Sequence, residues 1–376
     1  MVTDHREIAF EKAIEADLLA TGEYTKGDPA SFDRQLALHP DILLTFIKKS
    51  QPKAWERLEV VHGSQVEQKV LHRLHQVLDQ RGMLHVLRKG IEDYGVHLQS
   101  MFPKPASRLN PDAWEQYNQN ILTITRQVKY SMKNENSIDV LISINGLPVI
   151  TMELKNPLTG QNVEHAKRQY AEDRDPKELI FQFKKRVLVH FAVDPDEVYM
   201  TTKLEGHKTF FLPFNRGYNR GAGNPPNEYG FKTSYLWNGI LRKDSLIDLL
   251  SRFIHLEVKE KKKKGRLIKK ETMIFPRFHQ LDVVRKLEAD IIEKGVGQNY
   301  LIQHSAGSGK SNSIAWLAHR LSNLHNNADE LIFDSIIIIS DRRVLDKQLQ
   351  DTIYQFDHKP GVVERINKDS NQLAEA

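Results

Sequence analysis

The chain is 376 residues long, which is enough for two or three domains that each bury a hydrophobic core. With 40% hydrophobic and 27% charged residues, its composition is that of a soluble globular protein. It has no cysteine, which excludes disulfides and thiolate metal sites and fits a reducing compartment. No segment approaches the roughly 20 apolar residues of a membrane-spanning helix, and the N-terminus carries no apolar secretion signal, so we expect a soluble, cytoplasmic protein without a membrane partner. A net charge of +5 is compatible with nucleic acid but too small to indicate it alone.

The N-terminal region is predicted to be helical. Residues 8–21 place apolar side chains at helical spacing, with acidic side chains on the other face, and Gly22 suits a helix C-cap. On this pattern Glu11 and Glu15 are interpreted as solvated carboxylates. Helical patterns dominate again over residues 31–87, whose histidines lack the partner set of a zinc site.

The stretch from Asn136 to Lys155 reads as a β-hairpin. Residues 138–144 and 149–154 are rich in β-branched and aliphatic side chains, and ILTITRQVKY (121–130) predicts a strand before them. Asn145-Gly146, between the two runs, tolerates positive φ and is the strongest short hairpin signal.

Three polar residues interrupt this apolar hairpin. Glu153 and Lys155 are two residues apart and therefore project to the same face, and Asp139 on the neighbouring strand can face the same way. Two neighbouring carboxylates repel unless a cation lies between them, and their oxygens suit Mg²⁺. A lysine beside them can orient a water molecule or stabilise charge on a phosphate. The alternative interpretation is an edge strand whose charged side chains face water.

The elements after the hairpin predict a mixed sheet. Residues 163–172 form a helix pattern that ends before Asp175-Pro176, and residues 187–193 and 198–204 are strand patterns. The order helix, strand, hairpin, helix, strand, strand predicts a mixed α/β sheet with the hairpin at its centre. His190 is interpreted as a hydrogen-bonded core histidine.

A long loop and a basic run follow. Residues 213–230 are rich in Gly, Pro and Asn, and Arg216, Tyr218 and Arg220 in this loop are candidates to follow a DNA backbone, with a plain surface loop as the alternative. After a helix pattern at 245–255, the run KEKKKKGRLIKKE has almost nothing to bury and reads as a linker that also suits a phosphate-lined path. We therefore predict domains at 1–258 and 274–376, joined by a linker at 259–273.

A second motif lies in the C-terminal part. A short apolar strand is predicted at 299–302, and it is followed by HSAGSGKS (304–311) and a helix pattern. This sequence matches the phosphate-binding loop G-x-x-x-x-G-K-[ST], except that His304 stands at the first glycine. We expect backbone N–H groups to cradle an ATP phosphate, Lys310 to pair with the β- and γ-phosphates, and Ser311 to ligate Mg²⁺. The predicted nucleotide-binding residues of the loop are Gly307, Ser308, Gly309, Lys310 and Ser311.

These residues carry a resemblance to a known family. Asp139, Glu153 and Lys155 resemble the metal-binding signature of PD-(D/E)XK nucleases, and the surrounding sequence NGLPVITMELKNPLTGQNVEHAKRQYAEDRDP resembles the R subunit of type I restriction–modification enzymes. The resemblance implies that Asp139 and Glu153 hold Mg²⁺ and that Lys155 assists hydrolysis of a DNA phosphodiester. Members of this family also carry a Gln-x-x-x-Tyr pair on the next helix. Here Gln169 and Tyr170 are adjacent, and Gln169 is the candidate for the glutamine. The resemblance also offers Glu11 or Glu15 as a first-helix glutamate that helps to position the metal.

The C-terminal part resembles the motor of superfamily two helicases. Arg277 and Gln280 fit the R-x-x-Q element in which the glutamine reads adenine, and Arg343 and Gln348 are candidates for a DNA-backbone contact after a buried strand at 331–340. The Asp329-Glu330 pair reads as a turn rather than as the acidic Mg²⁺-binding motif of such motors. We therefore expect the chain to be the N-terminal piece of a longer motor subunit.

The whole sequence favours an α/β protein, with a mixed-sheet restriction-endonuclease-like domain followed by the beginning of a RecA-like parallel α/β lobe. The resemblance implies Mg²⁺-dependent cleavage of double-stranded DNA coupled to ATP-driven translocation. It also implies methyltransferase and specificity subunits as partners. Two alternatives stay open: a DNA translocase with a non-cleaving N-terminal domain, and a non-enzymatic docking platform.

Overall fold

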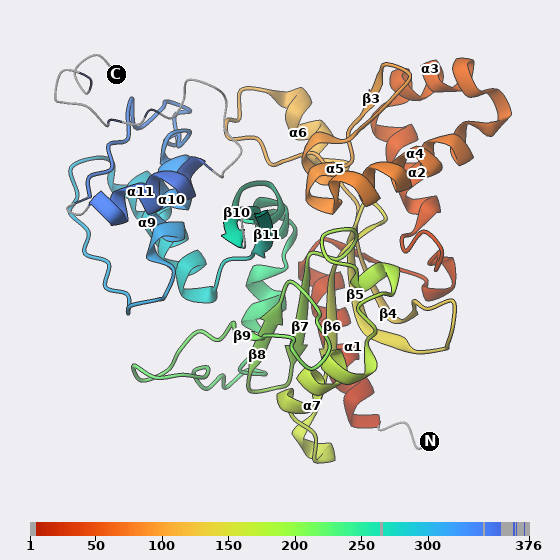
Figure 1. Ribbon diagram of the computed structural model, residues 1–376, viewed down its shortest axis with the longest axis horizontal. Helices are drawn as coiled ribbons and strands as arrows, with labels where there is room; N and C mark the ends of the chain where they lie inside the picture. Colours follow the sequence, from red (N-terminus) through yellow and green to blue (C-terminus); the bar gives the residue numbers. More distant parts are fainter. Residues whose placement is uncertain are drawn as a thin grey trace. The chain divides into compact units, whose positions relative to one another are not determined.

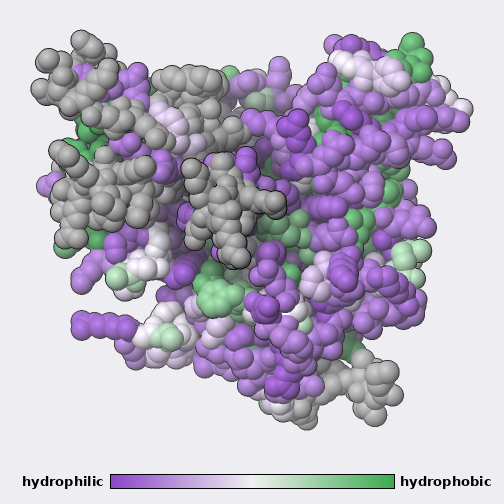
Figure 2. Space-filling view, viewed as in Figure 1, coloured by the Kyte–Doolittle hydropathy of each residue, from purple (hydrophilic) through white to green (hydrophobic). Residues whose placement is uncertain are grey.

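The computed structural model describes residues 5–263, 266–340 and 343–354, together with Glu364, Ile366 and Gln372. The chain divides into two compact units, Met1–Ile254 and His255–Ala376 (Figure 1). Most of the face visible in Figure 2 is hydrophilic, in keeping with the composition. Among the described residues, no helix combines the length and the low polarity needed to cross a bilayer.

The first unit is built on a seven-stranded mixed sheet with the order β1-β4-β5-β6-β7-β8-β9. Two neighbouring pairs, β1/β4 and β6/β7, are parallel, and the other neighbours are antiparallel. The strands are β1 (Tyr24–Lys26), β4 (Leu122–Lys129), β5 (Ser137–Ile144), β6 (Leu147–Leu154), β7 (Val189–Val193), β8 (Val198–Thr201) and β9 (Leu212–Pro213). The predicted mixed sheet is thereby confirmed, and β6 lies at its centre.

The predicted hairpin is formed by β5 and β6. Asn145 and Gly146 both have positive φ, 51° and 80°, as a tight two-residue turn requires. Every residue of β6 is buried, which explains why its sequence is continuously apolar rather than alternating. The Asn145 side chain also accepts a hydrogen bond from Ile121 N (2.7 Å), so the turn is tied to the chain segment that enters β4.

Two helices flank the sheet near the hairpin. The first, α1 (His5–Thr21), buries Phe10, which packs edge-on against Trp237 with ring centroids 5.9 Å apart. The second, α7 (Val163–Arg168), begins at Asn162, whose side chain accepts from Glu164 N, and it continues as a π-helix over Gln169–Asp173. A cluster of buried side chains that includes Ala166 and Tyr170 of this helix packs with β4, β5 and β7.

The remaining helices of the first unit lie mainly between β1 and β4 in sequence, as predicted for residues 31–87. Figure 1 shows α2 to α5 gathered together above the sheet. They are α2 (Pro40–Ser50), α3 (Pro52–His62), α4 (Val66–Arg81) and α5 (Met83–Lys89), followed by the hairpin β2 (Ile91–Asp93) and β3 (Val96–Leu98) and by α6 (Pro111–Asn118). The helix expected at 245–255 is α8 (Lys243–Asp248) with a π-helix at Leu249–Phe253.

The second unit differs from the expected parallel α/β arrangement. It contains the antiparallel hairpin β10 (His255–Lys263) and β11 (Arg266–Ile274), and the helices α9 (Phe278–Lys294), α10 (Lys310–Leu321) and α11 (Arg343–Tyr354). The basic run expected to be a linker at 259–273 thus lies in a hairpin, where main-chain pairing supplies the order that apolar burial does not.

The strands predicted at 299–302 and 331–340 are wrong for the described residues. Both segments are irregular, Leu301 is 94% exposed and Ile339 is 89% exposed. A parallel strand is stable only when neighbouring strands satisfy its backbone groups and helices cover its faces. The two apolar segments do not pair with each other, and no parallel sheet forms in the described part of this unit.

Candidate functional site

Asp139 and Glu153 come together on neighbouring strands at the centre of the sheet. The Asp139 carboxylate accepts a hydrogen bond from Leu154 N (2.8 Å), and this bond ties β5 to β6 directly beside Glu153. Asp139 is 8% exposed and Glu153 is fully buried. Lys155 follows β6, is half-buried, and donates its backbone N–H to Val193 O (2.9 Å) on β7. The structure therefore brings the three predicted residues to one end of the hairpin.

Two further side chains hold Glu153. Gln169 donates from Nε2 to Glu153 Oε2 (2.7 Å), and Arg174 donates from Nε to Glu153 Oε1 (2.7 Å). Arg174 also donates from Nη2 to Ser137 O (2.7 Å) on β5. Gln169 opens the π-helix and Arg174 caps it, and π-helical turns are frequent at functional sites. Gln169 thus lies at the predicted place, and its role in catalysis stays a prediction.

The two neighbouring carboxylates of Asp139 and Glu153 are electrostatically unfavourable without a further cation. Burial, together with the neighbouring charge of Asp139, raises the pKa of Glu153 to about 8, although Arg174 and Lys155 act in the opposite direction. Burial alone would lower the pKa of Arg174, but the interactions with Glu153 outweigh it and the pKa is raised. A divalent cation beside Glu153 would favour its ionised form.

The donor set fits Mg²⁺. Mg²⁺ is commonly held by one or two carboxylates, with water and substrate phosphate completing its shell, and Asp139 and Glu153 supply such a pair. In the part of the chain that the structure describes, no group of three or more His, Cys, Asp or Glu side chains could hold a metal by itself.

Glu11 and Glu15 are not solvated, which corrects the interpretation from the helical pattern. Glu11 is 2% exposed, and its carboxylate accepts from Gln127 Nε2 (2.8 Å) and forms an ion pair with Arg126 (3.4 Å). Glu15 is also buried and pairs with Arg126 at 3.0 Å. Arg126 on β4 lies under α1, and its positive charge compensates the two buried carboxylates. Glu11 borders the site, because Gln127 Nε2 also lies 3.4 Å from Asp139 Oδ1.

Thr151, two residues before Glu153 on β6, lies in a chain of buried hydroxyl and imidazole groups. Tyr170 Oη is 2.8 Å from Thr151 Oγ1, which is 2.7 Å from His190 Nδ1. Burial lowers the pKa of His190 to about 3, so the imidazole is neutral at physiological pH. The interpretation of His190 as a hydrogen-bonded core histidine is confirmed.

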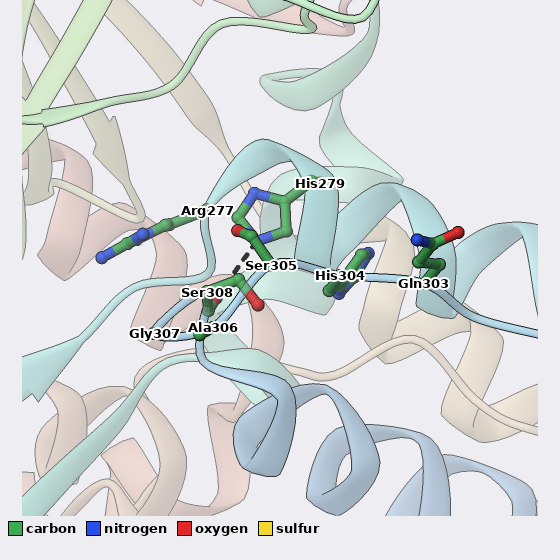
Figure 3. Close-up of a pocket in the computed structure, with 8 residues that line it drawn as sticks. All are labelled: Arg277, His279, Gln303, His304, Ser305, Ala306, Gly307 and Ser308. Atoms are coloured by element: carbon green, nitrogen blue, oxygen red, sulfur yellow. Dashed lines mark hydrogen bonds between the residues drawn. The ribbon is translucent and has the colours of Figure 1, made fainter.

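The phosphate-loop motif forms a turn before α10. The helix begins at Lys310, and Gly309 before it is left-handed (φ 84°), as is Gly307 (φ 73°). An open depression of about 260 Å³ lies beside the loop and is lined by Arg277, His279, Gln303, His304, Ser305, Ala306, Gly307 and Ser308 (Figure 3). Ser311 lies in the first turn of α10. Backbone N–H groups at such a helix start are a suitable place for an anion.

The predicted base-reading residues also lie beside this loop. Gln280 donates from Nε2 to Gly309 O (2.9 Å), while its Oε1 accepts from Arg277 N (2.9 Å). Lys310 Nζ donates to the carbonyl oxygens of His304 (3.2 Å) and Ser305 (3.0 Å), within the loop itself. The loop, Gln280 and Lys310 thus form one hydrogen-bonded group.

The remaining sequence predictions have mixed outcomes. Asp329-Glu330 lies in a turn, with Asp329 N bonded to Asn326 O (3.0 Å), which confirms its interpretation. The side chains of Arg343 and Gln348 lie outside the described residues. Arg174 and Gln127 were missed. Arg174 stands only two residues before Pro176 at a helix end, and neither residue has a distinguishing pattern in the sequence.

Comparisons with known proteins match both units. The family described as "Type I restriction enzyme R protein N terminus" matches residues 44–209, and the family described as "SWI2/SNF2 ATPase" matches residues 279–375. A protein named as the MjaVIIIP endonuclease subunit of a type I restriction enzyme, from Methanocaldococcus jannaschii, is 27% identical over 255 residues, covering 64% of this chain and 22% of that protein. The type I restriction enzyme HindI endonuclease subunit of Haemophilus influenzae is 26% identical over 219 residues, covering 57% of this chain and 19% of that protein.

The two family matches fall on the first and the second unit respectively. The aligned region is about a fifth of the length of either curated relative. The Asp139 and Glu153 pair lies inside the first matched region. Both family matches and both relatives therefore support a similarity of this chain to the N-terminal part of the R subunit of type I restriction enzymes.

Proposed function

We propose that the first unit hydrolyses DNA phosphodiester bonds in a Mg²⁺-dependent reaction at Asp139, Glu153 and Lys155. The observation that carries this proposal is the carboxylate pair at the centre of the sheet, one member of which is fully buried and carries a raised pKa. A purely structural core has no use for such a pair, because burying carboxylates side by side costs stability. A buried carboxylate with a strongly shifted pKa, such as that of Glu153, is typical of functional sites.

Each residue has a distinct part in this reaction. Asp139 and Glu153 would hold the metal, and Gln169 and Arg174 fix the orientation of the Glu153 carboxylate through one oxygen each. Mg²⁺, when bound, supplies Lewis-acid stabilisation of the phosphate and lowers the pKa of a water molecule. Lys155 carries its ammonium group beside this pair and orients the attacking water or stabilises charge on the phosphate.

The second unit would bind ATP phosphates at residues 304–311. Lys310 would exchange its bonds to the loop carbonyls for the β- and γ-phosphates, while Ser311 would ligate the nucleotide's Mg²⁺. Gly307, Ser308 and Gly309 would bring backbone N–H groups to the phosphate, and Arg277 and Gln280, which lie next to the loop, would read the base. In the full subunit, we expect ATP turnover to drive double-stranded DNA past the nuclease site, within an assembly that includes methyltransferase and specificity subunits.

The test is Mg²⁺-dependent nicking of supercoiled DNA by the purified chain. At high protein concentration, where DNA reaches the site by diffusion without the motor, wild-type protein is expected to convert supercoiled DNA slowly to the open circle with Mg²⁺ but not with EDTA. Glu153→Ala should lose about two orders of magnitude of this rate. Glu164→Ala, which removes an exposed carboxylate of α7, is the matched control and should nick normally. If the wild-type chain binds DNA but Mg²⁺ produces no nicks, the first unit is a non-cleaving DNA-binding domain.

A further inference from the structure

Gln127 has a strained backbone inside a strand. Its φ is +54°, a left-handed value that side chains other than glycine rarely adopt. Nine non-glycine residues of the described chain have positive φ, and Gln127 alone among them lies within a strand; the others lie in turns and loops. Its side chain is exposed, so core packing does not explain the strain. Backbone strain that packing does not require is frequently found at functional sites.

The strain redirects the side chain. Successive residues of a regular strand face opposite sides of the sheet. Here Arg126 and Gln127 are consecutive, yet both reach the same carboxylate, that of Glu11. The left-handed residue breaks the alternation of β4 and brings both side chains under α1.

Both the NH₂ group and the oxygen of the Gln127 side-chain amide form hydrogen bonds in this position. Its Nε2 donates to Glu11 Oε1 (2.8 Å) and lies 3.4 Å from Asp139 Oδ1. Its Oε1 accepts from Ser137 Oγ (2.8 Å), which fixes the amide so that the NH₂ group faces the carboxylates. One amide therefore bridges α1 and β5 at the exposed side of the site.

We propose that Gln127 is a positioning residue that holds the carboxylates of Glu11 and Asp139 together and so preorganises the site for a divalent cation; this inference rests on the proposed nuclease function. Without the amide, the two carboxylates repel and separate. Outer groups that orient metal-binding side chains typically change metal affinity by about 10- to 100-fold when removed. The backbone strain keeps the amide in place.

The experiment compares Gln127→Gly with wild type in nucleotide-free buffer, using Mg²⁺ as the titrant in calorimetry. Glycine accepts the left-handed backbone and removes the amide, so the thermal midpoint should stay equal or rise. The Mg²⁺ dissociation constant should increase at least about tenfold, and DNA nicking at limiting Mg²⁺ should fall in parallel. Saturating Mg²⁺ should restore most of the nicking rate, which a misfolded variant would not do.

Lys184→Gly is the matched control. Lys184 also has positive φ (61°), but it lies in a turn before β7, and its backbone carbonyl accepts a hydrogen bond from Met83 N. Replacing Lys184 with glycine therefore relieves backbone strain without touching the site. This variant should bind Mg²⁺ as wild type does. Asp139→Ala separates the two claims: if it abolishes Mg²⁺ binding while Gln127→Gly binds normally, the positioning role is wrong and the nuclease site stands. If Asp139→Ala also binds and nicks normally, the proposed function itself fails.

Discussion

At the scale of single residues, the proposed site chemistry depends most on the carboxylate of Glu153. It is fully buried, shares its surroundings with Asp139, and receives one hydrogen bond each from Gln169 and Arg174. The raised pKa means that the folded protein holds the Glu153 proton more tightly than the unfolded chain does. Stability from this group is complete below the unfolded pKa near 4.5 and is lost as the pH rises toward about 8.

Glu153→Gln should therefore stabilise the metal-free first unit at high pH. A shift from 4.5 to about 8 corresponds to at most roughly 5 kcal/mol in the free energy of unfolding, at about 1.4 kcal/mol per pH unit. The difference between variant and wild type should be near zero at pH 4.5 and should grow up to pH 8. Urea unfolding at a series of pH values measures it. If the free energies of unfolding of variant and wild type changed in parallel with pH, burial of the ionised Glu153 carboxylate would not carry this energetic cost.

Sequence reasoning located Asp139, Glu153 and Lys155 because polar residues inside an apolar hairpin stand out at a period of two. It did not locate Arg174, because the contact with Glu153 spans 21 residues and depends on where the π-helix ends. The interpretation of Glu11 as a solvated carboxylate was wrong for the same reason. Its compensating arginine, Arg126, is 115 residues away, and helical periodicity carries no information about that pairing.

At the scale of the elements, the β5–β6 hairpin depends on a turn that has no space for a side chain at Gly146. Gly146 has φ +80°, and a Cβ atom there would lie 2.4 Å from His39 O and 2.9 Å from Leu43 N. These are backbone atoms at the start of α2, which cannot move away as a flexible side chain would. The hairpin and α2 are therefore fixed against each other at this glycine.

Gly146→Ala should destabilise the first unit by about 3 kcal/mol, from backbone strain and overpacking together. Gly160→Ala is the matched control, because Gly160 has a similar φ of +77° in the left-handed helical region but no atom within 4 Å of the added Cβ. It should cost only about 1 kcal/mol. Urea unfolding of both variants measures the difference, and equal losses would mean that the turn tolerates a side chain.

Elements formed as expected where local pattern and tertiary context agreed. The turn residues Asn145-Gly146 and the continuous burial of β6 both favour the same hairpin. The apolar segments 299–302 and 331–340 have strand composition, yet both are irregular in the second unit. A sequence pattern identifies residues that suit a buried strand, but partner strands decide whether the strand forms.

At the scale of the whole molecule, the two proposed phosphate-binding sites lie in separate units. The first unit would use paired carboxylates and a metal, and the second would use helix N–H groups and Lys310. Neither set of atoms belongs to the other unit. We therefore expect any dependence of cleavage on ATP to come from movement of DNA rather than from shared ligands.

Lys310→Ala in the complete assembly should stop translocation and DNA cleavage together. The proposed nuclease residues have no evident means of reading sequence, so we expect the motor to deliver DNA to them in the assembly. Mg²⁺ binding at Asp139 and Glu153, measured by calorimetry without nucleotide, should be unchanged. Cleavage at the wild-type rate by this variant would show that delivery by the motor is dispensable.

The most direct measurement is DNA cleavage and ATP turnover, recorded together for the complete assembly carrying Asp139→Ala. Asp139 is bonded to β6 beside Glu153 and lies in the unit that does not hold the phosphate loop. The variant is expected to lose DNA cleavage while it hydrolyses ATP at the wild-type rate. Cleavage at the wild-type rate, or loss of both activities together, would contradict a separate metal-dependent nuclease site at Asp139 and Glu153.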